Sequence, residues 1–200
     1  MTDGEKQLWA LIDERLRPGA DVARIDARIW ELFGQTWAVV FTDLTGFSRM
    51  VAEFGIIHFL QEVHEQRSLF GPLIATHGGT LLKEEADSML LLFERPAQAV
   101  ECLIEMNRRT HEVNRDRAPE NKVLLCAGIG YGRVLRVGDR DVFGQEVNAS
   151  SKLGEDVAKA GEILITEAAR AELGDLPGLR FEPLTVRVPG TAMSFRVLYS

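Results

Sequence analysis

The chain has 200 residues, 46% of them hydrophobic, and a formal net charge of −7 at pH 7. This length and apolar content favour one compact domain with a small extension, and we expect no second catalytic domain. The acidic balance argues against a nucleic-acid partner, because a nucleic-acid surface needs a basic face that neutralises phosphates.

The N-terminal segment has neither the basic start nor the apolar run of a signal peptide, and no apolar stretch approaches the length of a membrane span. Cys102 and Cys126 are isolated in apolar stretches, which favours two buried, reduced thiols over a disulfide. We therefore expect a cytoplasmic protein with no membrane partner.

Two helices are predicted at the N-terminal end. Residues 5–15 carry apolar side chains at helical spacing, with charged residues between them. Pro18 and Gly19 break this helix, and Asp21 is placed to cap a second helix that ends near Gly34. This pair could be a signalling connector or a dimer contact, or it could pack on its own domain.

A strand is predicted from Trp37 through Asp43, followed by a long helix over residues 50–70 that the glycines after His77 end. Further elements follow in order: strands over residues 80–84 and 87–93 joined by Glu85-Ala86, a helix from Pro96 to Asn107, a strand pair over residues 123–132 and 133–143, a helix after Gly144, a strand over residues 163–166 before another helix, and a hairpin over residues 179–199 around Pro189-Gly190. An α+β fold with a ferredoxin-like βαββαβ core accommodates this order.

Two aspartates carry the strongest chemical signal. Asp43 lies in VVFTDLTGF and Asp87 in LLKEEADSMLLLF, each within a predicted buried strand. A buried carboxylate is costly unless a cation or a strong donor lies beside it. Two neighbouring strands would bring both carboxylates to one point, which suits Mg²⁺ bound to a nucleotide triphosphate. Taken alone, each aspartate is more often a turn or cap residue.

Four segments occur in an order typical of one family: FTDLTGFS, KEEAD, GIGYGRV and DVFGQEVNASSKL. From about Trp37 to about Leu198 the chain resembles the catalytic domain of class III adenylate and guanylate cyclases. The resemblance implies the same ferredoxin-like core. It divides the chain into an N-terminal helical extension, residues 1–35, and a cyclase homology domain, residues 36–200.

By this resemblance, Asp43 and Asp87 ligate two Mg²⁺ or Mn²⁺ ions, and the backbone carbonyl of Leu44 supplies another oxygen. The turn that follows would offer amide donors to the phosphates; its residues are Thr45, Gly46, Phe47 and Ser48. Gly46 allows close backbone approach, and the next helix presents its N-terminus to an anion. An ordinary strand-to-helix turn would use the same residue types.

Base choice in the family depends on two positions, which here are Lys83 and Asp141. Lysine can donate to adenine N1 and aspartate can accept from the adenine amino group, whereas guanine favours a different pair. The pair therefore points to ATP, with GTP a smaller possibility. The alternatives are a surface salt bridge of Lys83 with Glu84 or Glu85, and a hairpin-turn role for Asp141.

Asn148 matches the family asparagine that orients the ribose. Lys152 stands where the family usually has an arginine that stabilises developing charge, one turn along the same helix. The alternatives are that Asn148 satisfies backbone groups at a helix start, and that Lys152 pairs with Glu155 or Asp156.

Other departures from the family pattern concern the turn and the phosphate-binding cations. Ala86 replaces a glycine, which is tolerated only if its φ stays negative. Cys126 occupies a common arginine position, and Pro189 and Thr191 lie where a lysine is common. The strand-pair arm over residues 132–141 is also short for the family.

We interpret the chain as an enzyme that converts ATP to 3′,5′-cyclic AMP and pyrophosphate by in-line attack of the ribose 3′-oxygen. The family arrangement implies a homodimer in which one chain supplies the aspartates and the other supplies Lys83, Asp141 and Asn148. An upstream signalling partner is unidentified. The leading alternative is a catalytically degenerate domain that serves as a nucleotide-responsive or protein-binding signalling module.

Overall fold

The computed structural model describes residues 2–139 and 141–199, and the side chains of residues 47–50 and 120 are not described. One eight-stranded mixed sheet forms the body, with the order β2-β3-β1-β4-β6-β8-β7 and with β5 paired to β4. The strands are β1 (Gly34–Leu44), β2 (Thr80–Glu85), β3 (Ser88–Phe93), β4 (Leu125–Val137), β5 (Asp141–Phe143), β6 (Ile163–Thr166), β7 (Arg180–Pro183) and β8 (Ser194–Leu198).

Helices connect these strands in the order that the sequence predicts. They are α1 (Asp3–Arg15), α2 (Val22–Phe33), α3 (Phe47–Phe54), α4 (Ile56–Thr76), α5 (Pro96–Val113), α6 (Gln145–Ser151) and α7 (Glu167–Leu173), with a π-helical segment η3 (Lys152–Val157) and two short 3-10 turns, η1 (Asn114–Asp116) and η2 (Pro119–Asn121). The spatial order β4-β1-β3-β2 is that of a ferredoxin-like core, so the predicted fold class is confirmed. Among the described residues, no helix has both the length and the apolar content needed to cross a bilayer.

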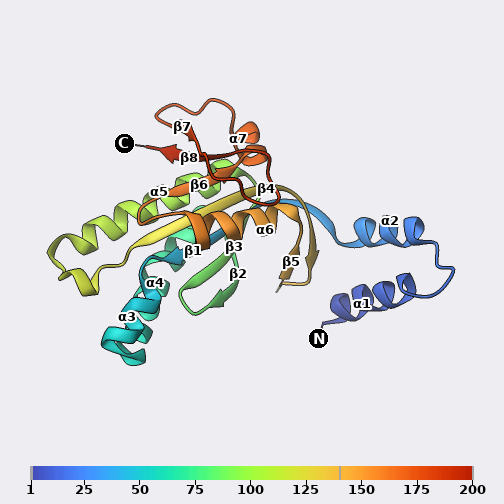
Figure 1. Cartoon of the computed structure of the whole chain (residues 1–200), viewed down its shortest axis with the longest axis horizontal. Coiled ribbons are helices and arrows are strands. Elements are labelled where there is room, and N and C mark those ends of the chain that lie inside the picture. The colour runs from blue at the N-terminus through green and yellow to red at the C-terminus, as the bar shows by residue number, and fades with distance from the viewer. Residues whose placement is uncertain (1, 140, 200) are drawn as a thin grey trace.

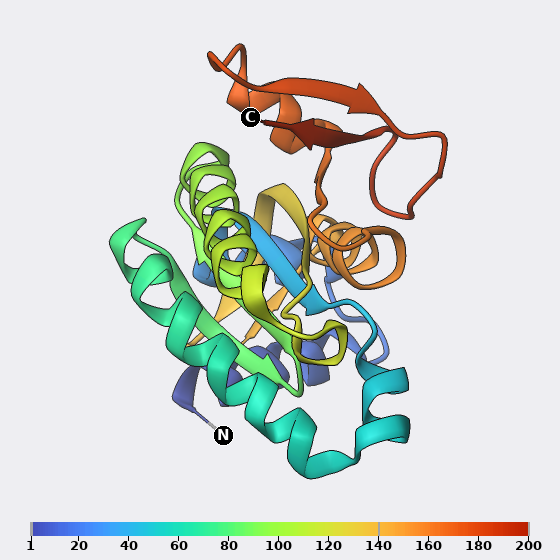
Figure 2. The ribbon, with the colours of Figure 1, turned by 90° about the vertical axis from the view of Figure 1, so that its left-hand side faces the viewer.

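The sheet has a different cover on each face. Figure 2 shows α4 and α5 side by side on one face, with α6 on the other. Val40 packs with Phe70 of α4 and Leu103 of α5, whereas its neighbour Val39 packs in the cluster that includes Val147 of α6. Because side chains alternate along a strand, Asp43 lies on the same face as Val39, under α6.

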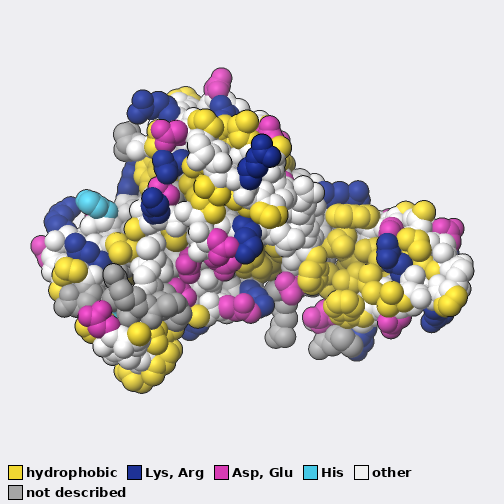
Figure 3. Space-filling model, viewed as in Figure 1, with side chains coloured by type: hydrophobic (Ala, Val, Ile, Leu, Met, Phe, Trp, Pro, Cys, Tyr) yellow, Lys and Arg dark blue, Asp and Glu magenta, His cyan; other side chains and the backbone are white. Residues whose placement is uncertain are grey.

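The helical hairpin α1–α2 projects from the body (Figure 1) and packs on the end of β4, where Leu8 and Ile29 bury Val137. The Asp21 carboxylate accepts from the Arg24 amide at 3.0 Å, which confirms the predicted cap. Within one chain the pair thus packs on its own domain. Apolar side chains remain on its surface (Figure 3), among them Leu16.

Two predicted elements are wrong in their boundaries. The long helix after Asp43 is two helices, α3 and α4, because Gly55 with φ +86° interrupts it. The predicted break after Gly132 does not exist, since β4 runs through to Val137 and its turn begins at Gly138. The glycines of β4 have another role: a Cβ at Gly130 would lie 2.4 Å from the Glu146 carbonyl oxygen, so they let α6 lie directly on the strand.

The predicted C-terminal hairpin is confirmed, since β7 and β8 pair antiparallel from Arg180 opposite Leu198 to Pro183 opposite Phe195. Its loop is long rather than tight. Pro189 and Gly190 lie within this loop, against the start of α6, where the Gln145 side-chain nitrogen donates to the Gly190 carbonyl at 2.8 Å.

Candidate active site

Asp43 and Asp87 come together at one end of the central strands. Asp43 is near the end of β1, opposite Cys126 of β4. Asp87 lies in the two-residue turn between β2 and β3, and β3 is the other neighbour of β1. The Ser88 hydroxyl donates to Oδ1 of Asp43 at 3.3 Å, which ties the turn to the strand. The structure therefore brings the two predicted metal ligands to one place.

Burial raises the proton affinity of both carboxylates. Burial and then the negative charge of Asp43 raise the pKa of Asp87 to about 7. Burial also raises the pKa of Asp43, although hydrogen bonds from Asp87 and Ser88 oppose that shift. Two like charges in a desolvated position are unfavourable unless a proton or a cation neutralises one of them.

A divalent cation fits this pair. Asp87 is only 4% exposed, and its Oδ2 atom is buried with no hydrogen-bond partner among the described residues. Such an oxygen is rare in native proteins and is the ligand type that Mg²⁺ and Mn²⁺ prefer. No group of three or more His, Cys, Asp or Glu residues in the described part of the chain could hold a metal. Further ligands would be backbone carbonyls, water or substrate oxygens.

The turn that carries Asp87 differs from the prediction in two ways. Asp87 follows β2 and Ala86 in the turn itself, rather than lying within a strand. Ala86 has φ +54°, so the expected negative φ is wrong, and it is the one described non-glycine residue with positive φ. Since the left-handed region costs an L-residue about 1–2 kcal/mol, the rest of the structure must hold this turn in place.

The turn after β1, predicted to bind phosphate, already uses one of its backbone amides in a hydrogen bond within the chain. The Thr45 amide donates to the Leu124 carbonyl at 2.8 Å, so phosphate contacts would have to come from the other amides of the turn. Gly46 has φ +96° and precedes α3, as a close backbone approach requires. The side chains of Phe47 and Ser48 lie outside the described residues. The Leu44 amide donates to the aspartate pair, which lowers the pKa of both carboxyls.

Lys83 and Asp141 line one small pocket of about 120 Å³ on the α6 face. Ser88 and Glu155 also line it, so the pocket adjoins the aspartate pair. Lys83 Nζ lies 2.5 Å from Glu85 Oε1, and Glu85, followed by Asp141, raises the pKa of Lys83. Lys83 and Asp141 therefore share one pocket, and the anticipated surface ion pair of Lys83 with Glu85 is also present.

Asn148 and Lys152 lie outside that pocket. Asn148 is exposed on α6, and Lys152 begins the π-helical segment. Lys152 Nζ pairs with Asp156 Oδ2 at 2.6 Å, one of the two partners expected from sequence, and both side chains are largely exposed. Within one chain, the structure does not bring these two residues into the pocket of Lys83 and Asp141.

Cys126 joins backbone segments rather than contacting phosphate. Its sulfur lies 3.5 Å from the Asp43 carbonyl oxygen and 3.4 Å from that of Gly154, and it accepts from the Thr45 hydroxyl. Burial raises the pKa of the Cys126 thiol to about 11. Both cysteines are buried and free, as predicted.

Near the C-terminal loop, the Thr191 hydroxyl donates to the Met193 carbonyl at 2.6 Å and accepts from the Glu167 amide. Neither Pro189 nor Thr191 supplies a cation, so the loop offers no charge at these two positions where the family commonly has a lysine.

Sequence reasoning missed three residues of the site. Ser88 contacts Asp43, Glu155 raises the pKa of Asp43 from η3, and Gln66 of α4 donates to the Asp87 carbonyl at 2.9 Å. Gln66 had a detectable signal, because it is a polar residue at the apolar spacing of a helix. The π-helical turn that places Glu155 has no simple sequence signature.

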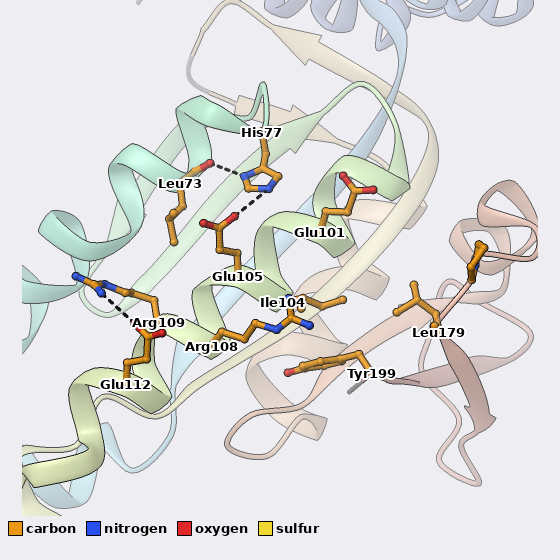
Figure 4. Close-up of a pocket in the computed structure, with 12 residues that line it drawn as sticks. Leu73, His77, Glu101, Ile104, Glu105, Arg108, Arg109, Glu112, Leu179 and Tyr199 are labelled. Carbon is orange, nitrogen blue, oxygen red and sulfur yellow. Dashed lines mark hydrogen bonds and ion pairs between the residues drawn. The ribbon is translucent and has the colours of Figure 1, made fainter.

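A larger cleft lies elsewhere. It has a volume of about 830 Å³ beside α4, α5 and the C-terminal segment (Figure 4), and shares no lining residue with the pocket of Lys83 and Asp141. Polar side chains contact one another within it: His77 Nε2 lies 3.3 Å from Glu105, and Arg109 forms an ion pair with Glu112 at 3.0 Å. The volume of a cleft alone therefore does not identify the candidate active site.

Comparisons with known proteins agree with the fold. Residues 34–192 match the adenylate and guanylate cyclase catalytic domain. An adenylate cyclase of Streptomyces coelicolor is 29% identical over 170 residues, which are 84% of this chain and 40% of that protein. The chain spans between 16% and 40% of the lengths of the curated relatives that it matches.

Solved structures share the fold. An adenylate/guanylate cyclase/hydrolase from Silicibacter pomeroyi has a TM-score of 0.68 at 23% identity, covering 82% of this chain and 95% of that one. The adenylyl cyclase CyaB from P. aeruginosa has a TM-score of 0.68 at 21% identity, covering 84% and 96%. With its family match over most of its length, the chain belongs to the adenylate and guanylate cyclase catalytic domain family.

Proposed function

We propose that the chain converts ATP to 3′,5′-cyclic AMP and pyrophosphate as the catalytic domain of a cytoplasmic signalling protein. One observation carries this proposal: Asp43 and the buried Asp87 lie together, and one Asp87 oxygen has no hydrogen-bond partner among the described residues, which favours a cation there. Family membership supports cyclase chemistry in general.

Asp43 and Asp87 would hold two Mg²⁺ or Mn²⁺ ions, with the Leu44 carbonyl as a further ligand. When bound, these ions favour the alkoxide form of the ribose 3′-hydroxyl and neutralise charge on the leaving pyrophosphate. The Ser88 hydroxyl orients the Asp43 carboxylate toward Asp87. The described turn after β1 presents Gly46 and the start of α3 to the triphosphate.

Lys83 and Asp141 would select adenine. The lysine donates to N1, and the aspartate accepts from the exocyclic amino group, whereas guanine presents a carbonyl oxygen that would face the carboxylate of Asp141. The position of both side chains in one pocket supports this assignment. Because Glu85 also contacts Lys83, nucleotide binding would have to replace an exposed ion pair, which costs little.

Asn148 would orient the ribose, and Lys152 would place positive charge near the developing negative charge. Both lie outside the pocket of their own chain. In a symmetric homodimer, one chain would supply the aspartates while the other would supply Lys83, Asp141, Asn148 and Lys152. We therefore propose a homodimer with two shared sites.

The proposal is tested by incubating the purified chain with ATP or GTP and Mn²⁺ and identifying the products by mass. We expect cyclic AMP from ATP. Mixing the inactive variants Asp43→Ala and Asn148→Ala under subunit exchange should restore roughly a quarter of wild-type activity, because about half of the dimers then carry one intact site. No restoration from an active wild type contradicts the shared site.

A second candidate function rests on the missing cations. Cys126, Pro189 and Thr191 provide no positive charge, and Lys152 is paired with Asp156. Losing one charge-stabilising donor typically costs about 3 kcal/mol, or on the order of a hundredfold in rate. A demonstrated dimer that binds ATP and Mn²⁺ but forms no cyclic nucleotide would establish a signalling module instead of an enzyme.

A further inference from the structure

Gln66 is a polar side chain in a row of core positions. The buried residues of α4 are Phe59, Val63, Gln66, Phe70 and Ile74, a spacing at which packing alone favours apolar side chains. Gln66 is 1% exposed. A buried amide is unfavourable unless it forms hydrogen bonds, so its contacts show what it does there.

The Gln66 side chain reaches the turn that carries Asp87. Its Nε2 atom donates to the Asp87 backbone carbonyl at 2.9 Å, across from the helix to the β2–β3 hairpin. The next residue makes a second link between the same elements, since Arg67 Nε lies 2.8 Å from Glu84 Oε2. The first link is buried, and the second joins an exposed arginine to a half-buried glutamate.

Asp87 needs such an anchor more than Asp43 does. Asp43 is fixed by regular pairing of β1 with both β3 and β4, whereas Asp87 lies in a turn whose other residue, Ala86, is held at φ +54°. One carboxylate oxygen of Asp87 has no hydrogen-bond partner among the described residues. The backbone bond from Gln66 therefore opposes relaxation of the turn and, with it, movement of the carboxylate.

We propose that Gln66 is a positioning residue that fixes the backbone of Asp87 and thereby the spacing of the two carboxylates that take the divalent cations. This inference rests on the proposed function. Gln66 acts through Asp87, so its loss weakens metal affinity more than it affects nucleotide recognition by Lys83 and Asp141. Partners that orient metal ligands typically contribute roughly 10- to 100-fold in affinity.

The test is Gln66→Met, which keeps the length and volume of the side chain and removes the donor. Mn²⁺ binding to the full chain is measured by electron paramagnetic resonance without nucleotide, alongside thermal unfolding. We expect Mn²⁺ affinity to fall by about tenfold or more. Gln61→Met makes the same change at an exposed position of α4 and should bind Mn²⁺ like the wild type.

Val63→Ala provides the control for a general loss of stability, because it removes buried apolar volume one turn before Gln66 and keeps the Gln66 donor. It should lower the unfolding temperature and leave Mn²⁺ affinity unchanged. Adding Ala86→Gly to Gln66→Met should recover part of the affinity, because glycine adopts the turn conformation without an anchor.

The possible outcomes separate the two proposals. Wild-type Mn²⁺ affinity in folded Gln66→Met overturns the positioning role, and so does an equal loss of affinity in Val63→Ala. Mn²⁺ binding by the wild type without cyclic nucleotide formation overturns the proposed function alone. A wild type that binds no Mn²⁺ overturns both.

Discussion

The aspartate site and the larger cleft beside α5 differ in how their charged groups are compensated. In the cleft, acidic and basic side chains pair, as in the contacts of His77 with Glu105 and of Arg109 with Glu112. At the aspartate site, two like charges share a partly desolvated position, and one Asp87 oxygen has no partner among the described residues. The contacts of the cleft join groups of opposite type, whereas the aspartate site is satisfied only when it gains a proton or a cation.

This difference shows why volume is a poor guide to chemistry in this protein. The cleft is several times larger than the pocket of Lys83 and Asp141. A surface whose acidic and basic groups are paired needs no ligand to neutralise it. An uncompensated carboxylate pair instead favours a positively charged ligand, and groups whose pKa is perturbed in this way are candidates for functional sites.

The largest effect should come from removing one carboxylate charge at the aspartate site. Asp43→Asn and Asp87→Asn should each abolish cyclic nucleotide formation, because one carboxylate cannot hold the cations. Thermal unfolding should show that the metal-free fold is retained, since the like-charge repulsion is also removed. Glu105→Gln in the cleft is the matched control, and the comparison breaks if it lowers turnover as much.

A smaller effect is expected at Lys152. Its contact with Asp156 is exposed, so Lys152→Ala should leave the stability of the fold nearly unchanged. If the ammonium acts on the developing charge, the same variant should lose on the order of a hundredfold in turnover, and Lys152→Arg should exceed the wild type. Rates of cyclic nucleotide formation by the three proteins decide this, and an unchanged rate in Lys152→Ala excludes the catalytic role.

The stability of the metal-free protein should depend on pH through the aspartate pair. The pKa of Asp87 is about 7 in the folded chain, so the folded state binds more protons than the unfolded state above about pH 4. Stability should therefore fall as pH rises toward 7, by about 2 kcal/mol from about pH 5.5, and then level off. Denaturant unfolding measures this slope, which Asp87→Asn should flatten and saturating Mn²⁺ should oppose.

The smallest expected effect concerns the turn. Ala86→Gly relieves the positive φ of this position and should stabilise the fold by up to about 1 kcal/mol, despite the greater freedom of glycine in the unfolded chain. Urea unfolding of both proteins measures the change. A loss of stability would mean that the turn is not strained by its alanine.

The sequence predicted what depends on periodicity and capping. The cap at Asp21, the helix start after Gly144 and the strand from Ile163 to Thr166 followed directly from local patterns. Asp43 and Asp87 could be paired because neighbouring strands bring them together.

Features that depend on tertiary contact could not be read in the same way. The sequence predicts a strand boundary after Gly132, yet this residue lies within β4 beneath Glu146, where a Cβ would be 3.1 Å from the side-chain Cγ. Gly55 interrupts a pattern whose apolar residues continue on both sides. Ala86 has a positive φ in a turn that is contacted by Gln66 of α4, which is distant in the sequence.

The junction of α2 and β1 has a mechanical consequence. The helix ends at Phe33 and the strand begins at Gly34, without a loop between them. The Arg133 guanidinium lies over the Trp30 ring at 4.7 Å and donates to the Trp30 carbonyl, which braces this joint. Because no flexible loop separates the helix from the strand, a rotation of the projecting hairpin would be transmitted to β1, the strand that carries Asp43 near its other end.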